Sequence, residues 1–120
     1  MSLFAAILAA LAALVLLMAG AQKIALRRSV TEPMRRLGVA DRATRLIGVL
    51  ELAGASGLVV GIWFVPLGLA AGIGLAALLL SAVVVHARAG DYRSRHHRGS
   101  AAAPIVLLLV LGLAGTLLVI

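Results

Sequence analysis

The chain has 120 residues, of which 63% are hydrophobic and 12% are charged, and its formal net charge is +7 at pH 7. Soluble domains contain about 45–50% apolar and about 25% charged residues, so this composition excludes a water-soluble domain and indicates a protein dissolved in lipid. Because the chain has no cysteine, disulfides, thiolate nucleophiles and thiolate metal sites are excluded. The length favours a single transmembrane domain over residues 1–120.

Long apolar stretches predict the helices, since a membrane-spanning helix needs about 20 residues. Residues 2–22 are uncharged, and the stretch 46–85 is long enough for two spans, with a break at Pro66. We expect an all-α, integral membrane four-helix bundle with helices at approximately 2–22, 43–64, 66–87 and 100–120. A short surface helix is predicted over 31–38, and Asp41 is expected to cap the helix that follows.

The positive charges predict how the bundle is oriented in the membrane. Seven Lys and Arg residues lie between positions 23 and 45, and the other four lie between 88 and 98. The positive-inside rule places both basic loops in the cytoplasm, and therefore both termini and the turn at Pro66 outside. Trp63 suits the outer interface. In a membrane protein such charge indicates contact with anionic lipid headgroups, and no nucleic-acid partner is expected.

A second interpretation of the first helix is a secretory signal peptide. Ala19-Gly20-Ala21 follows the apolar run and resembles a cleavage site. However, signal peptides begin with positive charge, and here no Lys or Arg precedes Lys23. The pattern therefore favours a retained first span.

Glu51 is the one ionisable group within the stretch 46–85. A carboxylate at membrane depth normally points into the bundle and finds a partner or stays protonated. Lys23 and His86 end the first and third spans on the same predicted side, so they are expected to share an interior with Glu51. Gln22 is a further candidate for hydrogen bonding there. Glu51 would either exchange protons and anchor a ligand, or form a structural pair that fixes helix register.

Small residues predict where the helices pack closely in lipid. Gly48 and Gly54 lie on the helix face of Glu51, and Gly68 and Gly72 lie on that of His86. Lys23 and His86 also have purely structural interpretations: Lys23 would be a snorkelling topology anchor, and His86 would cap its helix at the membrane interface.

The basic loop after the third span contains the pair His96-His97 together with Asp91. This spacing matches no recognised metal motif, and arginines surround it, so a solvated loop on anionic lipid is favoured and no metal site is predicted. No catalytic dyad or nucleotide fingerprint is present in the sequence, which leaves enzymatic activity undecided.

Three stretches resemble the DoxX-like family of small four-helix membrane proteins. They are Gly20-Ala-Gln-Lys23 at the end of the first helix, RLIGVLELAGASGLVVG around Glu51, and AVVVHARAGD around His86. The resemblance covers almost the whole chain and implies a four-helix bundle. The scarce lysine and abundant Arg, Ala and Leu indicate a bacterial genome, so we expect the protein in the bacterial cytoplasmic (inner) membrane. The resemblance also implies a setting near membrane redox chemistry, since members are associated with quinone-coupled thiosulfate oxidation and oxidant stress, while distant relatives look like membrane chaperones.

Three functions follow from these patterns. The leading hypothesis is an accessory protein that binds a quinone or another small lipophilic ligand near Glu51, Lys23 and His86, with no covalently bound cofactor. The second is a non-catalytic subunit or assembly factor that packs against a membrane protein partner or another copy of itself. The third is a small transporter or channel, for which four short helices leave little room.

Overall fold

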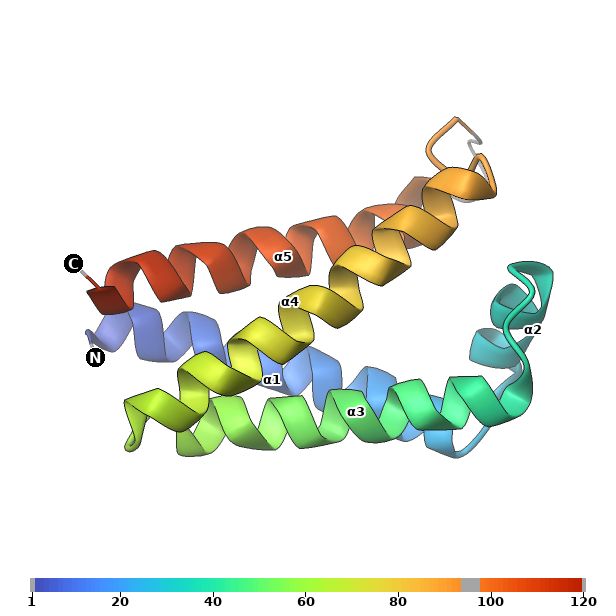
Figure 1. Cartoon of the computed structure of the whole chain (residues 1–120). Helices are drawn as coiled ribbons and strands as arrows, with labels where there is room; N and C mark the ends of the chain where they lie inside the picture. Colours follow the sequence, from blue (N-terminus) through green and yellow to red (C-terminus); the bar gives the residue numbers. More distant parts are fainter. Residues whose placement is uncertain (1, 94–97, 120) are drawn as a thin grey trace.

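The computed structural model describes residues 2–93 and 98–119, and the secondary structure in this part of the chain consists of α-helices joined by short connections (Figure 1). Apolar stretches form the long helices, and a charged segment forms the short one. The helices are α1 (Leu3–Ile24), α2 (Arg28–Arg36), α3 (Asp41–Val60), α4 (Val65–Arg88) and α5 (Arg98–Val119).

Three of these helices, α1, α3 and α4, are long and apolar enough to cross a membrane. Their outward side chains include exposed Leu3, Leu46 and Ile73, which suit contact with lipid rather than water. The helix predicted over 100–120 corresponds to α5, whose apolar stretch Ala101–Gly115 is shorter than a span among the described residues. A fourth span therefore stays a prediction.

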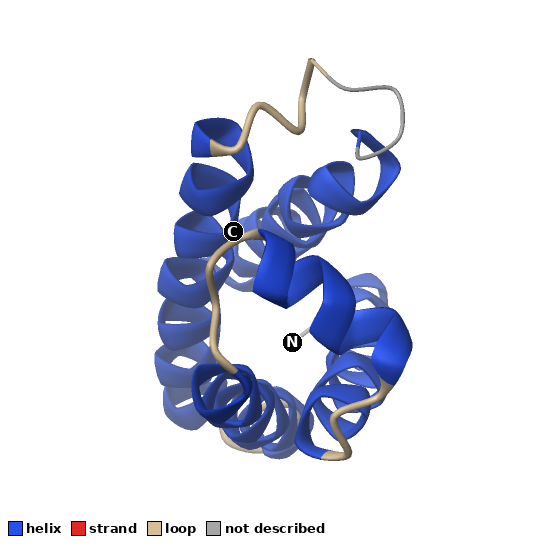
Figure 2. Ribbon diagram, turned by 90° about the vertical axis from the view of Figure 1, so that its right-hand side faces the viewer, coloured by secondary structure: helices blue, strands red, loops and turns tan. Residues whose placement is uncertain are grey.

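The four long helices pack in a cyclic order. Among the described residues, α1 contacts α3 and α5, and α4 contacts the same two helices. Figure 2 shows the long helices nearly end-on, with α2 lying across one end. The core between the long helices is small and apolar, and is formed by Ala12, Ala13, Leu16, Ala55, Leu58 and Leu75.

Glycines let α3 approach its neighbours closely. A Cβ atom added at Gly48 would lie 2.7 Å from the Gly20 carbonyl oxygen of α1, so the two backbones touch there. A Cβ atom added at Gly61 would lie 2.3 Å from the Cα of Gly68 at the start of α4. Gly54 receives the side chain of Leu75 in the same way. Such contacts are how helices without a water-driven hydrophobic effect pack in lipid.

The short helix begins earlier than the predicted range 31–38. α2 starts at Arg28, directly after Arg27, whose backbone is extended. Thr31 was expected at the start of the helix but is instead buried within it. Gly38 follows α2 with a φ of 82°, as a chain-reversing glycine does. Asp41 does not cap α3 because it is the first helical residue, and Ala40 occupies the cap position.

The two basic segments lie at the same end of the molecule. Helix α2, the end of α4 and the start of α5 lie at one end, whereas both termini and the α3–α4 turn lie at the other (Figure 1). Arg36 of α2 and Asp91 after α4 form an ion pair across this end. The connection bends at Gly90, which has a φ of 76°. The fold thus separates a charged end from an apolar one.

Candidate functional site

Glu51 and Lys23 form an ion pair between α3 and α1. The Lys23 Nζ donates a hydrogen bond to Glu51 Oε1, and the side chains are only 19% and 6% exposed. Glu51 lies on the buried face of α3, one turn from Gly48. The backbone contact of Gly48 with Gly20 brings the end of α1 close enough for Lys23 to reach the carboxylate. The close approach of α1 and α3 at Gly20 and Gly48 therefore allows the ion pair to form.

His86 has different partners from the expected ones. Its Nδ1 lies 2.5 Å from Asp91 Oδ2, and no hydrogen bond or ion pair within residues 2–93 joins it to Glu51 or Lys23. The Gln22 side chain is half-buried and has no hydrogen-bond partner in the described part of the chain. The structure thus brings Glu51 and Lys23 together and places His86 in a second cluster; ligand binding by any of them stays a prediction.

Asp91 is the centre of this second cluster. Two guanidinium N–H groups of Arg36 donate to its two carboxylate oxygens at 3.0 and 2.9 Å. These bonds, and next the contact with His86, hold the pKa of Asp91 at about 2 although burial opposes this. Tyr92 adds a hydrogen bond from its hydroxyl to the Ala101 carbonyl of α5 at 2.9 Å. The cluster therefore ties α2, α4 and α5 together.

Sequence reasoning did not find the pairing of Arg36 with Asp91, or the burial of Thr44. Thr44 is fully buried, and its hydroxyl has no hydrogen-bond partner among the described residues. One signal was available for it, because Thr44, Gly48 and Glu51 follow each other at helical spacing on one face of α3. No comparable signal exists for Arg36 and Asp91, which are 55 positions apart in the sequence and are separated by helices α3 and α4.

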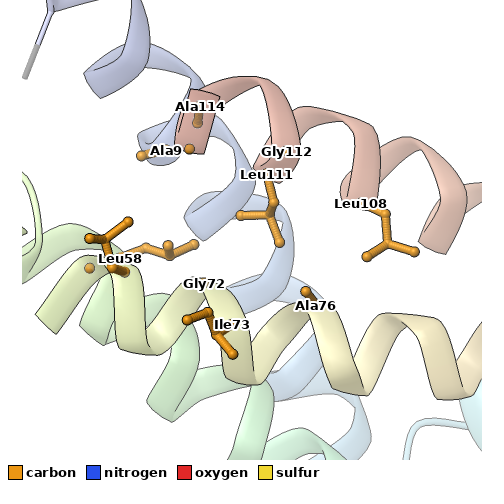
Figure 3. Close-up of a pocket in the computed structure, with 12 residues that line it drawn as sticks. Ala9, Leu58, Gly72, Ile73, Ala76, Leu108, Leu111, Gly112 and Ala114 are labelled. Atoms are coloured by element: carbon orange, nitrogen blue, oxygen red, sulfur yellow. The ribbon is translucent and has the colours of Figure 1, made fainter. Parts of the chain in front are cut away.

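An apolar cavity of about 250 Å³ lies between the long helices, and its lining includes Ala9 near the start of α1 and Ala114 near the end of α5. Figure 3 shows its lining, which comes from α1, α3, α4 and α5 and includes Ala9, Leu58, Ile73 and Leu111. All of its lining residues are Ala, Gly, Leu or Ile. Gly72 belongs to this lining rather than to a tight helix contact, since a Cβ added there would meet nothing within 4 Å.

Neither Glu51, Lys23 nor His86 lines the cavity. No group of three or more His, Cys, Asp or Glu side chains that could hold a metal ion occurs among residues 2–93 and 98–119. The pair His96-His97 lies outside the described residues. The candidate sites are thus the Lys23–Glu51 pair and the Asp91 cluster at the charged end, and the hydrocarbon-lined cavity toward the other end.

Comparison with known proteins gives one match. A family model described as the DoxX-like family matches residues 7–114, from the second turn of α1 to the last third of α5. The matched range contains both ion-paired clusters and almost all of the cavity lining. No curated protein and no solved structure matches the chain.

Proposed function

The chain belongs to the DoxX-like family, and from that premise we propose that it is an accessory membrane protein that binds a small lipophilic molecule. A quinone is the ligand that suits the redox setting of the family. The location proposed is the bacterial inner membrane, with four spans and with the charged end in the cytoplasm. In this role the protein needs no reaction of its own, since any redox chemistry would be supplied by the ligand.

The apolar cavity is the observation that carries this function. Its volume of about 250 Å³ is somewhat below the range of about 300–1,000 Å³ for sites that enclose a drug-sized ligand, so it suits part of a ligand. Ile73, which belongs to the lining, is 73% exposed on the outside of α4. The cavity is therefore accessible from the side that would face lipid, and a hydrocarbon group could enter it from the bilayer.

The Lys23–Glu51 pair lies on the same buried face of α3 as the cavity lining. Leu58 and Glu51 are seven positions apart, which is about 10 Å along a helix, and Ala55 of the core lies between them. A ligand confined to the cavity would not reach the carboxylate. We therefore place the hydrocarbon part of the ligand in the cavity and give the Lys23–Glu51 pair the task of joining α1 to α3.

The other two functions have less support. The close glycine contacts at Gly20–Gly48 and Gly61–Gly68 join helices of the same chain, so these glycines are already used within the bundle and do not point to an external partner. A channel or transporter needs polar groups along its path, and the cavity is lined by hydrocarbon and glycine alone.

A matched pair of variants tests the proposed site. Gly72 lines the cavity, and a Cβ added there would meet nothing within 4 Å. Ala77 lies on the same helix but is exposed and lines neither this cavity nor the second apolar pocket beside Gly74. The purified protein is titrated with a short-chain ubiquinone analogue while its thermal unfolding is followed. We expect the analogue to raise the Tm of the parent protein and of Ala77→Leu, but not of Gly72→Leu, because the leucine side chain at position 72 fills the cavity.

Two outcomes would contradict the proposal. One is that solvent extraction of the protein from native membranes releases no quinone or distinct lipid, and the analogue does not change the Tm. The other is that Gly72→Leu keeps the full shift, which would move the ligand to a different site. If the analogue no longer raises the Tm of Glu51→Gln but still raises that of Gly72→Leu, the ligand binds at the Lys23–Glu51 pair instead of in the cavity.

A further inference from the structure

Helix α2 is short and buries few of its side chains, so it is only weakly stabilised by its own residues. It has nine residues, and isolated helices shorter than about 12–15 residues are only marginally stable in water. Thr31 is its one fully buried residue, while Val30 and Met34 on the same side are half-buried. It packs against α1 and α3 at the charged end of the molecule (Figure 2). Its position must therefore depend on polar contacts with the rest of the chain.

Both connections of α2 turn at residues with left-handed backbone conformation. Leu26 precedes the helix with a φ of 52°, and Gly38 follows it with a φ of 82°. Glycine adopts this conformation freely, but for leucine it is strained. Helix α2 thus lies between two sharp bends, and the backbone strain at Leu26 would be released if the helix moved.

The contact with Asp91 holds α2 to a distant part of the chain. Arg36 forms a bidentate, charge-assisted pair with Asp91, a geometry that is both strong and directional. Asp91 is held from its other side by His86, and its side chain is 1% exposed, whereas that of Arg36 is 34% exposed. The carboxylate is therefore a fixed receptor, and the arginine is the partner that water can reach.

The neighbouring pair of Arg35 with Asp41 cannot serve the same purpose. It is also bidentate, but it joins residues only six positions apart across the loop from α2 to α3, and both side chains are more than one-third exposed. Exposed pairs of this kind contribute little to stability. Arg35 therefore provides a natural control for Arg36.

We propose that α2 is a strap across the charged end of the molecule, closed by the Arg36–Asp91 pair and hinged at Leu26 and Gly38. When the pair breaks, α2 moves away from α1 and α3, and water gains access to the side of α2 that carries Thr31. This device is independent of what the apolar cavity binds.

The absence of cysteine in the chain allows a direct test. Thr31→Cys places a thiol on the buried side of α2, and its rate of reaction with a charged, water-soluble maleimide reports opening. In this background we expect Arg36→Gln to raise the rate about ten-fold, because opening no longer breaks a bidentate ion pair. Arg35→Gln is expected to leave the rate nearly unchanged.

Further variants keep the result tied to the pair. Asp91→Asn should raise the rate as well, and combining it with Arg36→Gln should add little, since both remove the same contact. If Arg36→Gln loses its helical circular dichroism or its monodisperse elution, Arg36→Lys is used instead, and a smaller rise is expected because lysine keeps the charge but not the bidentate geometry. Equal rates in the parent, Arg36 and Asp91 variants of a folded protein would overturn the strap.

Discussion

At the residue scale, the Lys23–Glu51 pair raises the question of what a buried carboxylate does in a membrane helix. Two buried charges lose hydration when they pair, so such a pair is weak evidence for stability by itself. Its value lies in specificity, because the Lys23 ammonium has a partner only when α1 and α3 are in this register. Removing one partner is a different matter, since it leaves the other charge uncompensated.

Glu51→Gln is therefore expected to lower the free energy of unfolding by about 3 kcal/mol, measured by denaturant or thermal unfolding in detergent. The 19% exposure of Lys23 gives the unpaired ammonium some access to water, which keeps the loss at the lower end of the range for buried pairs. Lys23→Met combined with Glu51→Gln should cost less than the sum of the single variants. Unchanged stability together with lost quinone binding would instead make Glu51 a ligand-binding group.

At the element scale, the backbones of α1 and α3 come into contact at Gly20 and Gly48. A methyl group at Gly48 would lie 2.7 Å from a backbone oxygen and 3.0 Å from the Cβ of Lys23, so the helices would have to separate. Their separation would also stretch the Lys23–Glu51 pair one turn away. A glycine contact and an ion pair thus depend on each other.

We predict that Gly48→Ala destabilises the protein by about 1–3 kcal/mol, as overpacking in a close contact does. Gly72→Ala is the matched control, because it makes the same chemical change in a long apolar helix but meets nothing within 4 Å. It should be neutral or stabilising by up to about 1 kcal/mol, since alanine favours a helix more than glycine. Equal losses of unfolding free energy in the two variants would contradict the role of the α1–α3 contact.

The sequence was most informative where a residue's role depends on its own helix. Runs of apolar residues and Pro66 gave α3 and α4 to within a few positions of Asp41–Val60 and Val65–Arg88. Helical spacing put Gly48 beside Glu51, and the shared side of the membrane suggested Lys23 as a partner. These predictions need only the 3.6-residue period and the length of a span.

Contacts made through loops could not be predicted in this way. His86 was expected to turn toward Glu51, but the chain bends back at Gly90 and presents Asp91 to it. Arg36 reaches the same carboxylate from α2, whose start was misplaced because Thr31 resembled a capping residue and is instead buried. The cavity could not be predicted either, since its lining residues come from four different helices and form no sequence motif.

At the scale of the whole molecule, the two ends differ in chemistry. Helix α2 and the end of α4 lie at one end of the molecule, while the termini and the α3–α4 turn lie at the other (Figure 1). The ion pairs Lys23–Glu51 and Arg36–Asp91 belong to the charged end. Trp63 belongs to the α3–α4 turn, and the cavity lining includes Ala9 near the start of α1 and Ala114 near the end of α5. In a membrane, this polarity would hold the protein in one orientation, because clustered Lys and Arg remain on the cytoplasmic side and Trp prefers the interface. It would also open the cavity to the leaflet opposite the charged end.

Single-cysteine variants of this cysteine-free chain test that orientation. Ser29 in α2, Arg93 in the second basic segment and Trp63 in the α3–α4 turn are all exposed. With a membrane-impermeant maleimide, Ser29→Cys and Arg93→Cys should react in inverted vesicles but not in intact spheroplasts, and Trp63→Cys should show the reverse. Labelling of Ser29→Cys and Arg93→Cys from opposite sides would contradict a common basic end, since α4 would then not return the chain to the side on which α2 lies. Labelling of both from the outside would keep the fold and invert the protein, and the cavity would then face the cytoplasmic leaflet.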